Sequence, residues 1–303
     1  MDKLPVFFRQ EQSSKAAASY SPSAGKPALV MADWLGNDKL APLLEVHSFE
    51  PANDAVLCGA HDPGYVAGVL SGEIENGFEN TNMEIANSLR YTVGSMLAAA
   101  TYVLTDKNRG PVRMACSPTS GFHHAGYAWG GGYCTFNGLI ATAVRVHQLG
   151  LAKRILILDF DQHYGNGTQD IIDFLKLDFI THITAIKSYN TTAQTLAKAD
   201  LLNNNTLCND HHNQKFDLIL YQAGADIHLD DPLRGRLTTS QMCQRDANIF
   251  TAAQVWGIPL VWNLAGGYQR DKAGTIAPVL ALHHQTLMEC LSLKTCNAPA
   301  SSS

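Results

Sequence analysis

Residues 154–168, RILILDFDQHYGNGT, place two acids and a histidine directly after a run of apolar residues. The apolar run is typical of a buried strand in a parallel sheet. Asp159, Asp161 and His163 follow at every second position, so their side chains point the same way where the strand opens into a loop. Two carboxylates at this spacing repel each other unless a cation lies beside them. The stretch therefore predicts a strand whose carboxyl end presents ligands to a metal ion.

The rest of the chain repeats this alternation of apolar strands with amphipathic helices. Further strand-like runs are PVFFR (5–9), VRMAC (112–116), ITHITAI (180–186), DLILYQA (217–223) and IPLVWNL (258–264). Helix-like segments lie at residues 84–104, 136–150, 168–177, 240–257 and 276–291. The pattern predicts an α/β fold with a mostly parallel central sheet flanked by helices on both faces. No repeat or linker divides the chain, so we expect a single domain over residues 1–303, with a disordered tail from about residue 297.

Composition and charge narrow the classes of function. The formal net charge of −5 gives no excess of Lys and Arg for a phosphate backbone, so we expect no nucleic-acid partner. Seven cysteines without a CxxC pair predict reduced thiols rather than a disulfide framework. The N-terminus is too polar for a signal peptide, and no apolar run has the length of a membrane span. We therefore expect a cytoplasmic protein that does not act at a membrane.

Four of the predicted strands run into polar or glycine-rich segments, and in a parallel sheet such carboxyl ends meet at one edge. Asp226, which follows the run 217–223, would join Asp161 and His163 there as a third metal ligand. Three protein ligands with an open position are typical of a catalytic zinc, although an oxygen and nitrogen set also suits Fe(II) or Mn(II). The alternative is that these acids only cap a helix or join a buried network. We favour the metal site because several acids converge on one edge.

His123 and His124 follow the run 112–116 and precede three glycines at residues 130–132. Glycine at such a place lets the backbone approach a ligand closely. Two adjacent imidazoles beside a metal site could act as general base and general acid, because histidine titrates near neutral pH. Both histidines are therefore catalytic candidates.

Four segments in this region together resemble the motif series of the zinc-dependent histone deacetylase family, which includes bacterial histone deacetylase-like amidohydrolases. The segments are GFHHAGYAWGGGYCTFN (121–137), ILILDFDQHYGNGTQD (155–170), YQAGADIHLDDPLRGRLT (221–238) and NLAGGYQRD (263–271), in the order of the family. A fifth segment, AHDPGYV (60–66), resembles an upstream motif of the same family. The resemblance covers roughly residues 113–271 and implies the arginase/deacetylase α/β fold.

The resemblance implies a role for each residue that matches a motif. Asp161, His163 and Asp226 would bind the zinc ion. His124 would be the principal base, which takes a proton from water and then protonates the leaving amine. His123 would lie beside it as an electrostatic partner.

Other positions take roles from the same resemblance. Tyr268 would donate its hydroxyl to the amide oxygen as that oxygen becomes negative. Asp159 would hold His123, and a potassium ion is implied near the strand that carries Asp159. Gly132 and Tyr133 would line a narrow apolar tunnel for the four-carbon stem of an acyl-lysine.

Two positions depart from patterns in the family. Asn166 stands where some members have an aspartate behind the second histidine, so His124 should be less basic than with a carboxylate partner. Leu233 stands where acetylpolyamine deacetylases that resemble this chain have an acidic gatekeeper. Leucine offers no partner to the second cationic amine of a polyamine.

The function implied is zinc-dependent hydrolysis of the amide bond of acyl-lysine in proteins or peptides. Such a protein is a metal-dependent amidohydrolase acting on linear amides. Two alternatives remain open, namely a deacetylase of acetylpolyamines or other small amides, and a weakly active protein that binds acyl-lysine. Leu233 favours acyl-lysine over polyamines, and the presence of Tyr268 favours catalysis over binding alone.

Overall fold

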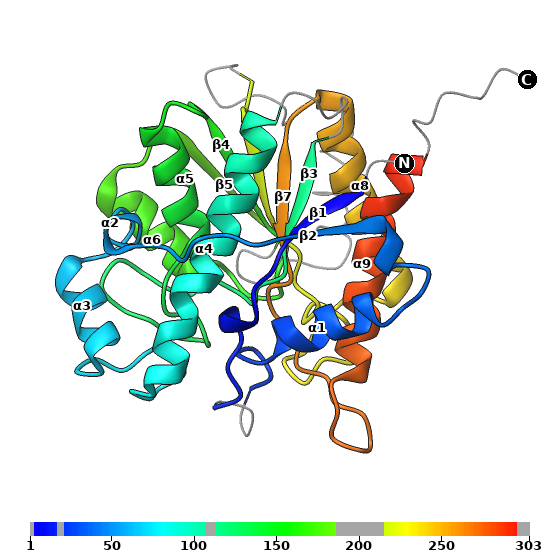
Figure 1. The fold of residues 1–303 in the computed structure, drawn as a ribbon, viewed down its shortest axis with the longest axis horizontal. Coiled ribbons are helices and arrows are strands. Elements are labelled where there is room, and N and C mark those ends of the chain that lie inside the picture. The colour runs from blue at the N-terminus through cyan, green and yellow to red at the C-terminus, as the bar shows by residue number, and fades with distance from the viewer. Residues whose placement is uncertain (1–2, 17–20, 107–112, 186–214, 296–303) are drawn as a thin grey trace, which may run out of the picture.

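The computed structural model describes residues 3–16, 21–106, 113–185 and 215–295. Its central element is a sheet of seven strands: β1 (Leu4–Phe7), β2 (Leu44–His47), β3 (Met114–Ser117), β4 (Ile155–Asp159), β5 (Ile180–Thr184), β6 (Leu218–Gln222) and β7 (Leu260–Asn263). The strands lie in the order β2–β1–β3–β7–β6–β4–β5, and each neighbouring pair is parallel (Figure 1). The prediction of an α/β fold built on a parallel sheet is confirmed.

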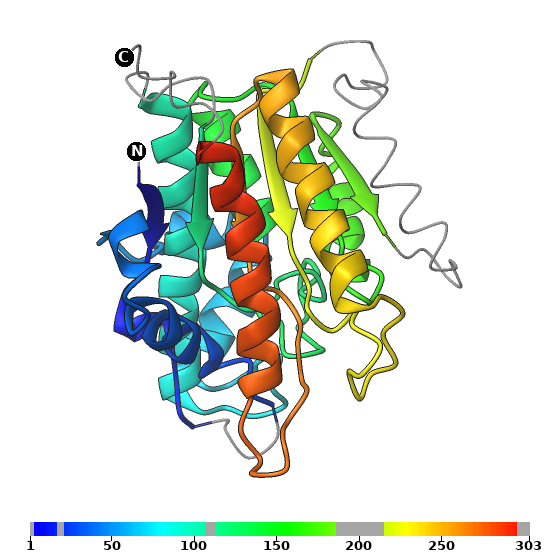
Figure 2. The same ribbon diagram turned by 90° about the vertical axis from the view of Figure 1, so that its right-hand side faces the viewer.

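Helices cover both faces of this sheet. One layer holds α2 (Asp54–Leu57), α3 (Pro63–Ser71), α4 (Met83–Thr105), α5 (Gly138–Gln148) and α6 (Asn166–Leu175). The other layer holds α1 (Lys26–Leu35), α8 (Thr239–Trp256) and α9 (Ala277–Thr295). Figures 1 and 2 show the two layers on opposite sides of the sheet, with α8 and α9 next to each other. The short 3-10 helices η1 (Gln10–Gln12) and η2 (Ala41–Leu43) lie near the N-terminal strands.

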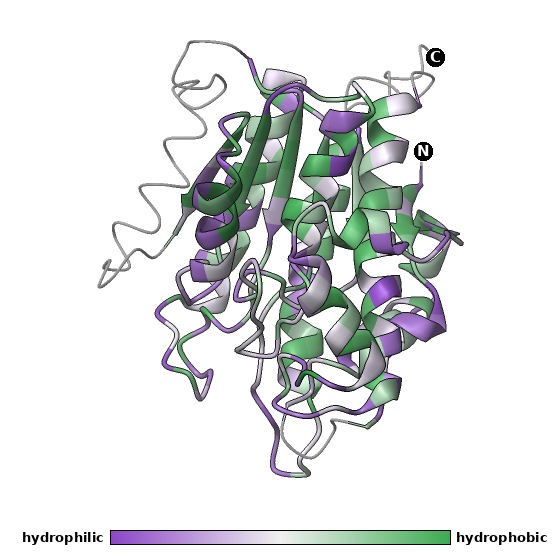
Figure 3. Cartoon of the chain, turned by 90° about the vertical axis from the view of Figure 1, so that its left-hand side faces the viewer, coloured by the Kyte–Doolittle hydropathy of each residue, from purple (hydrophilic) through white to green (hydrophobic). Residues whose placement is uncertain are grey.

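The central strands divide their side chains between the two faces. In β4, Ile155 and Ile157 join the core on the side of α4 and α5, whereas Leu156 and Leu158 join the core on the side of α8 and α9. The same alternation holds along β6 and β7. Figure 3 shows these strands in the colour of hydrophobic residues, with hydrophilic residues on the outer surfaces of the helices. Burial on both faces explains why the central strands read as continuous apolar runs.

Some parts of the fold have no counterpart in the sequence-based prediction. The edge strand β2 has the sequence LEVH and partly exposed side chains, so it lacks the apolar run of the central strands. Helices α1, α2 and α3 lie in the N-terminal part of the chain, where no helix was expected. The tail predicted from about residue 297 lies outside the described residues. Over the ranges that the structure describes, no helix is both long and apolar enough to cross a membrane.

Candidate active site

A row of polar side chains ends five neighbouring strands at the same level of the sheet. Asp159 at the end of β4 is in register with Thr184 of β5 and with Gln222 of β6. Gln222 is level with Asn263 of β7, which is level with Ser117 of β3. The loops after β3, β7, β6 and β4 therefore start side by side, at the edge where parallel α/β sheets bind ligands.

A cavity of about 230 Å³ opens at this edge, and the loops after the four strands contribute to its wall. The candidate residues in the wall are His123, His124, Gly132, Tyr133, Asp161, His163, Leu233 and Tyr268. Asp226 is fully buried beside this wall. Asp159 and Asn166 reach the site through hydrogen bonds to the two histidines. The structure thus brings all the predicted site residues to one place.

Asp161, His163 and Asp226 form a compact set of metal donors. One possible ligand atom from each residue lies within 4.8 Å of the others. The Nδ1 atom of His163 is 3.1 Å from Asp226 Oδ2 and 3.3 Å from Asp161 Oδ1. Backbone amides hold the other carboxylate oxygens, because Gly266 donates to Asp161 Oδ2 at 3.0 Å and Gln162 donates to Asp226 Oδ1 at 3.1 Å.

The surroundings of these three residues fit a cation. Burial and, after it, the charge of Asp161 raise the pKa of Asp226 to about 7, and a cation beside the two carboxylates would offset both effects. Glycine leaves the room that this pair needs, because a Cβ atom on Gly266 would lie 2.5 Å from Asp226 Oδ2 and 2.8 Å from Asp161 Oδ2. Two carboxylates and one imidazole with an open position match the donor set of a catalytic Zn²⁺.

His124 is arranged to accept a proton. Its Nδ1 atom lies 2.5 Å from Asn166 Oδ1, and an amide oxygen can only accept a hydrogen bond. The ring therefore carries its proton on Nδ1, which leaves the Nε2 lone pair free. Burial and the neighbouring His123 lower the pKa of His124 to about 4, so the ring is neutral near pH 7.

His123 has the opposite electrostatic environment, although the two rings are only 4.1 Å apart. Its Nδ1 donates to Asp159 Oδ2 at 2.7 Å, and Gln222 Nε2 donates to the other oxygen of Asp159 at 3.1 Å. Burial acts to lower the pKa of His123, but Asp159 and Asp161 outweigh it and raise the pKa to about 9. The pair therefore combines a charged imidazolium with a neutral imidazole, and such a separation of pKa values is typical of an acid and base pair.

The loop of residues 126–137, here called the tunnel loop, forms one wall of the cavity. Its turn has positive φ at both central residues, Gly132 (+52°) and Tyr133 (+64°), as a type I′ turn requires. Reciprocal backbone hydrogen bonds between Gly131 and Cys134 close this turn. For a residue with a side chain, the left-handed backbone conformation costs about 1–2 kcal/mol of free energy. The contacts around Tyr133 must therefore hold it in this conformation.

Tyr268 and Leu233 complete the cavity. The rings of Tyr268 and Tyr133 are 5.8 Å apart, and Asp231 Oδ2 accepts a hydrogen bond from the Tyr268 amide at 2.8 Å. Burial and the nearby carboxylates raise the pKa of Tyr268 well above its usual value, so its hydroxyl keeps its proton. Leu233 lines the cavity with a side chain that is partly exposed to solvent.

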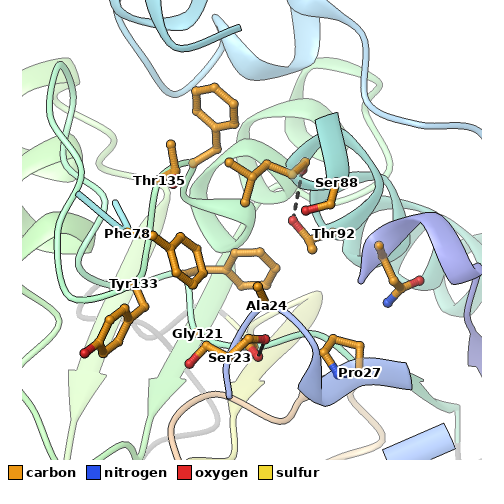
Figure 4. A pocket seen from close by; sticks show the side chains of 14 residues that line it. Ser23, Ala24, Pro27, Phe78, Ser88, Thr92, Gly121, Tyr133 and Thr135 are labelled. Atoms are coloured by element: carbon orange, nitrogen blue, oxygen red, sulfur yellow. Dashed lines mark hydrogen bonds between the residues drawn. The ribbon is translucent and has the colours of Figure 1, made fainter. Parts of the chain in front are cut away.

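A smaller cavity of about 30 Å³ adjoins the larger one and shares Ser23, Gly121 and Tyr133 with it. Figure 4 shows Phe78 and Tyr133 close together at its side, in agreement with their ring distance of 5.6 Å. Phe78 therefore contacts the ring of Tyr133, which lies in the wall of both cavities.

The structure adds residues that sequence reasoning missed. Gln222 links Asp159 to the Phe122 amide, and its position as the last residue of an apolar strand was a usable signal. Lys26 is fully buried beneath the site, where its Nζ atom donates to Ala265 O at 2.5 Å. Burial lowers the pKa of Lys26 to about 8. No local pattern marks Lys26, because it comes from α1 and meets the site only through the fold.

Comparisons with known proteins agree with this geometry. A family model described as "Histone deacetylase domain" matches residues 23–195. Histone deacetylase 2 of Arabidopsis thaliana is 32% identical over 179 residues, which are 52% of this chain and 45% of that protein. Acetylpolyamine amidohydrolase of Mycoplana ramosa is 52% identical over 56 residues, or 18% of this chain and 16% of that protein.

Among solved structures, the crystal structure of the HDA15 HD domain has the same fold. It superimposes with a TM-score of 0.74 over 96% of this chain and 92% of that chain, at 18% sequence identity. The likeness shows that the arrangement of the parallel sheet and its helices is shared.

Proposed function

The chain belongs to the histone deacetylase domain family, and on this premise we propose that it hydrolyses the amide bond of acyl-lysine side chains in proteins or peptides. It is a hydrolase that acts on amides, as its relatives are. One observation supports the proposal most strongly. A single cavity brings together a three-donor metal set, an imidazole with a free Nε2 and a protonated phenol.

In this proposal, Asp161, His163 and Asp226 hold the metal ion, which we take to be Zn²⁺, with Fe²⁺ as the alternative. When bound, the ion would polarise the amide carbonyl and make the attacking water more acidic. The family resemblance also leads us to propose a structural K⁺ near the end of β4. The remaining chemistry belongs to side chains of this chain.

His124 would take a proton at Nε2 from the attacking water, whose oxygen bonds to the carbonyl carbon. The same proton would pass to the nitrogen as the carbon–nitrogen bond breaks, which yields a carboxylic acid and a free lysine amine. His123, held by Asp159, would remain an imidazolium and favour the negative charge that develops on the oxygen. Tyr268 would donate its hydroxyl to that oxygen.

The shape of the cavity favours an uncharged acyl-lysine stem. Gly132 gives the wall a stretch of backbone without a side chain and Tyr133 gives it an aromatic ring, and both suit four methylene groups. A polyamine would bring a second cation to the mouth of the cavity, where Leu233 provides no charge to receive it. We also propose that residues 1–303 act as one catalytic domain, because β1 and β7 belong to the same sheet.

The second candidate is hydrolysis of an acetylpolyamine. The 52% identity with part of the acetylpolyamine amidohydrolase is the observation that favours it. The third, a weakly active acyl-lysine-binding protein, is disfavoured because Tyr268 is present and faces the cavity.

The test measures release of free amine from acyl-lysine peptides and from acetylpolyamines by the wild-type protein and by Leu233→Glu. We expect turnover of the peptides by the wild type and a shift of kcat/KM towards polyamines in the variant, because Glu adds a partner for the second amine. Turnover of polyamines alone by the wild type would replace acyl-lysine with the second candidate. Binding of peptides without any turnover would support the third.

A further inference from the structure

The segment AHDPGYV (60–66) has no role in the proposed chemistry, yet the structure places it against the tunnel loop. We propose that His61 and Tyr65 are positioning residues that fix the tunnel loop in its working geometry beside His124. The inference rests on the proposed function, because it assigns these residues to the wall that grips the substrate.

His61 joins the two ends of the tunnel loop. It is fully buried, its Nδ1 lies 2.9 Å from Gly126 O, and its Nε2 lies 2.7 Å from the backbone nitrogen of Asn137. A carbonyl can only accept and an amide N–H can only donate, so the ring must be neutral with its proton on Nδ1. Burial lowers the pKa of His61 to about 4, in agreement with a neutral ring. One imidazole thus closes a loop of residues 126–137.

Tyr65, four residues further on in α3, holds the same loop near its C-terminal end. Its hydroxyl donates to Thr135 O at 3.0 Å, and Thr135 Oγ1 accepts a hydrogen bond from the Gly77 amide at 2.8 Å. Gly77 O in turn accepts from the amide of Tyr133 at 2.9 Å. Figure 4 shows Tyr133 and Thr135 on the same side of the smaller cavity as Phe78. The chain of bonds therefore runs from Tyr65 to the strained turn.

The position of this turn matters because it contacts the proposed base. A Cβ atom on Gly132 would lie 2.5 Å from Cδ2 of His124, so the backbone there packs directly on the imidazole. The ring of Tyr133, the next residue, faces Tyr268 at 5.8 Å. If the tunnel loop were released at its ends, it would lose the contact of Gly132 with His124 and that of Tyr133 with Tyr268. In the proposed function, the stem of the acyl-lysine depends on both contacts.

The hydrogen bonds of the His61 ring are confined to one segment of the chain. Both hydrogen bonds of the His61 ring end on the backbone of the tunnel loop, and the ring packs on Phe136 of the same loop at 5.5 Å. Asp62, the next residue, donates its amide to Tyr127 O at 2.9 Å. The motif therefore acts on one segment of the chain, and that segment forms one wall of the cavity.

The test compares His61→Phe, which keeps a ring but removes both hydrogen bonds, with His61→Gln, which supplies a donor and an acceptor on one group. His147→Phe is the matched control, because His147 also bonds a backbone carbonyl and stacks on a ring but lies in α5, away from the cavity. Each variant is examined by amide hydrogen exchange of residues 126–137 and by steady-state kinetics on an acetyl-lysine peptide. Tyr65→Phe provides a second, milder change if His61→Phe does not fold.

We expect His61→Phe to speed exchange in residues 126–137 selectively and to raise KM about tenfold, with kcat changed less than about threefold. His61→Gln should recover part of both effects, and His147→Phe should show neither. Unchanged exchange and unchanged KM in both His61→Phe and Tyr65→Phe would overturn the inference. If the wild type hydrolyses no acyl amide, the proposed function fails, whereas the exchange measurement still decides whether these residues hold the loop.

Discussion

His123 and His124 are neighbours in the sequence, yet their hydrogen-bond partners and pKa values differ. The Nδ1 atom of His123 is hydrogen-bonded to a buried carboxylate, and the Nδ1 atom of His124 is hydrogen-bonded to a neutral amide. These partners, with burial, move the two pKa values in opposite directions, to about 9 and about 4. The residue types predicted a catalytic pair, but the charge of each ring depends on atoms that come from β4 and α6.

The partner of His124 can be tested by changing Asn166 to Asp. A carboxylate favours the imidazolium, so the pKa of His124 should rise from about 4, by about one to three units. Because His124 must be neutral to accept a proton, the acidic limb of the kcat/KM profile should move to higher pH by the same amount. Asp at the first turn of α6 is also compatible with the helix dipole.

Gln169→Glu is the control for this change. It adds the same charge to α6, but Gln169 contacts His182 and Asp173 instead of His124. An acidic limb that stays in place in Asn166→Asp, or that moves equally in Gln169→Glu, would contradict the role of His124 as the base.

Tyr268→Phe tests whether the Tyr268 hydroxyl donates a hydrogen bond to the amide oxygen. The variant keeps the ring and loses one donor to the developing oxyanion, so kcat should fall by about 10²–10³. Metal content, measured by elemental analysis, should stay unchanged because Tyr268 is not among the three donors. Tyr133→Phe, which alters the facing ring at 5.8 Å, should retain most of its activity. Near-normal turnover by Tyr268→Phe would remove this residue from the mechanism.

At the scale of elements, the turn of the tunnel loop offers a matched pair of glycines. Gly132 has φ of +52°, and a Cβ there would lie 2.5 Å from His124 Cδ2. Gly131 has nothing within 4 Å of the corresponding position. We expect Gly132→Ala to lower the free energy of unfolding by about 1–2 kcal/mol and to impair turnover.

Gly131→Ala should change the free energy of unfolding by less than about 0.5 kcal/mol. Denaturant titration and steady-state kinetics on both variants provide the comparison. Equal behaviour of the two variants would mean that the turn does not depend on its left-handed geometry.

The proposed metal donors come from two elements, the loop after β4 and the loop after β6. Asp226→Asn keeps the volume of the side chain and an oxygen for the Gln162 amide, but removes the charge. We expect the purified variant to contain almost no metal, and added zinc to raise the melting temperature of the wild type but not of the variant.

Asp170→Asn is the control for this experiment, since Asp170 accepts a hydrogen bond from the Tyr127 amide outside the donor set. Full metal occupancy in Asp226→Asn would place the ion elsewhere. Loss of metal in both variants would point to a general effect of removing charge.

Some of these elements and site residues could be predicted from the sequence, and others could not. The strands around β4 could be predicted because both of their faces are buried, which leaves an unbroken apolar run. Edge strand β2 could not, because half-exposed residues carry no such run. Asp161, His163 and Asp226 could be singled out because each lies within four residues of a strand end. Lys26 could not, because it is far from the other site residues in the sequence and only the tertiary fold brings α1 next to Ala265.

For the molecule as a whole, the order of the strands is what makes one site out of distant segments. β3, β7, β6 and β4 are consecutive in the sheet although they are separated in the sequence. The histidines, Tyr268 and the three proposed metal donors therefore meet at one edge, on loops that start from strands of the same sheet. Local patterns indicated which segments carry polar residues, and the rule for parallel sheets indicated that they should meet.

The most direct test of the central claim is a titration of the metal-stripped protein with zinc, followed by release of free amine from an acetyl-lysine peptide. The proposed function predicts no turnover without metal. The rate of amine release should rise linearly with added zinc and level off at one equivalent per chain, since the described residues offer one three-donor set of this kind. Full turnover by the stripped protein, or no turnover at one equivalent of zinc, would contradict it.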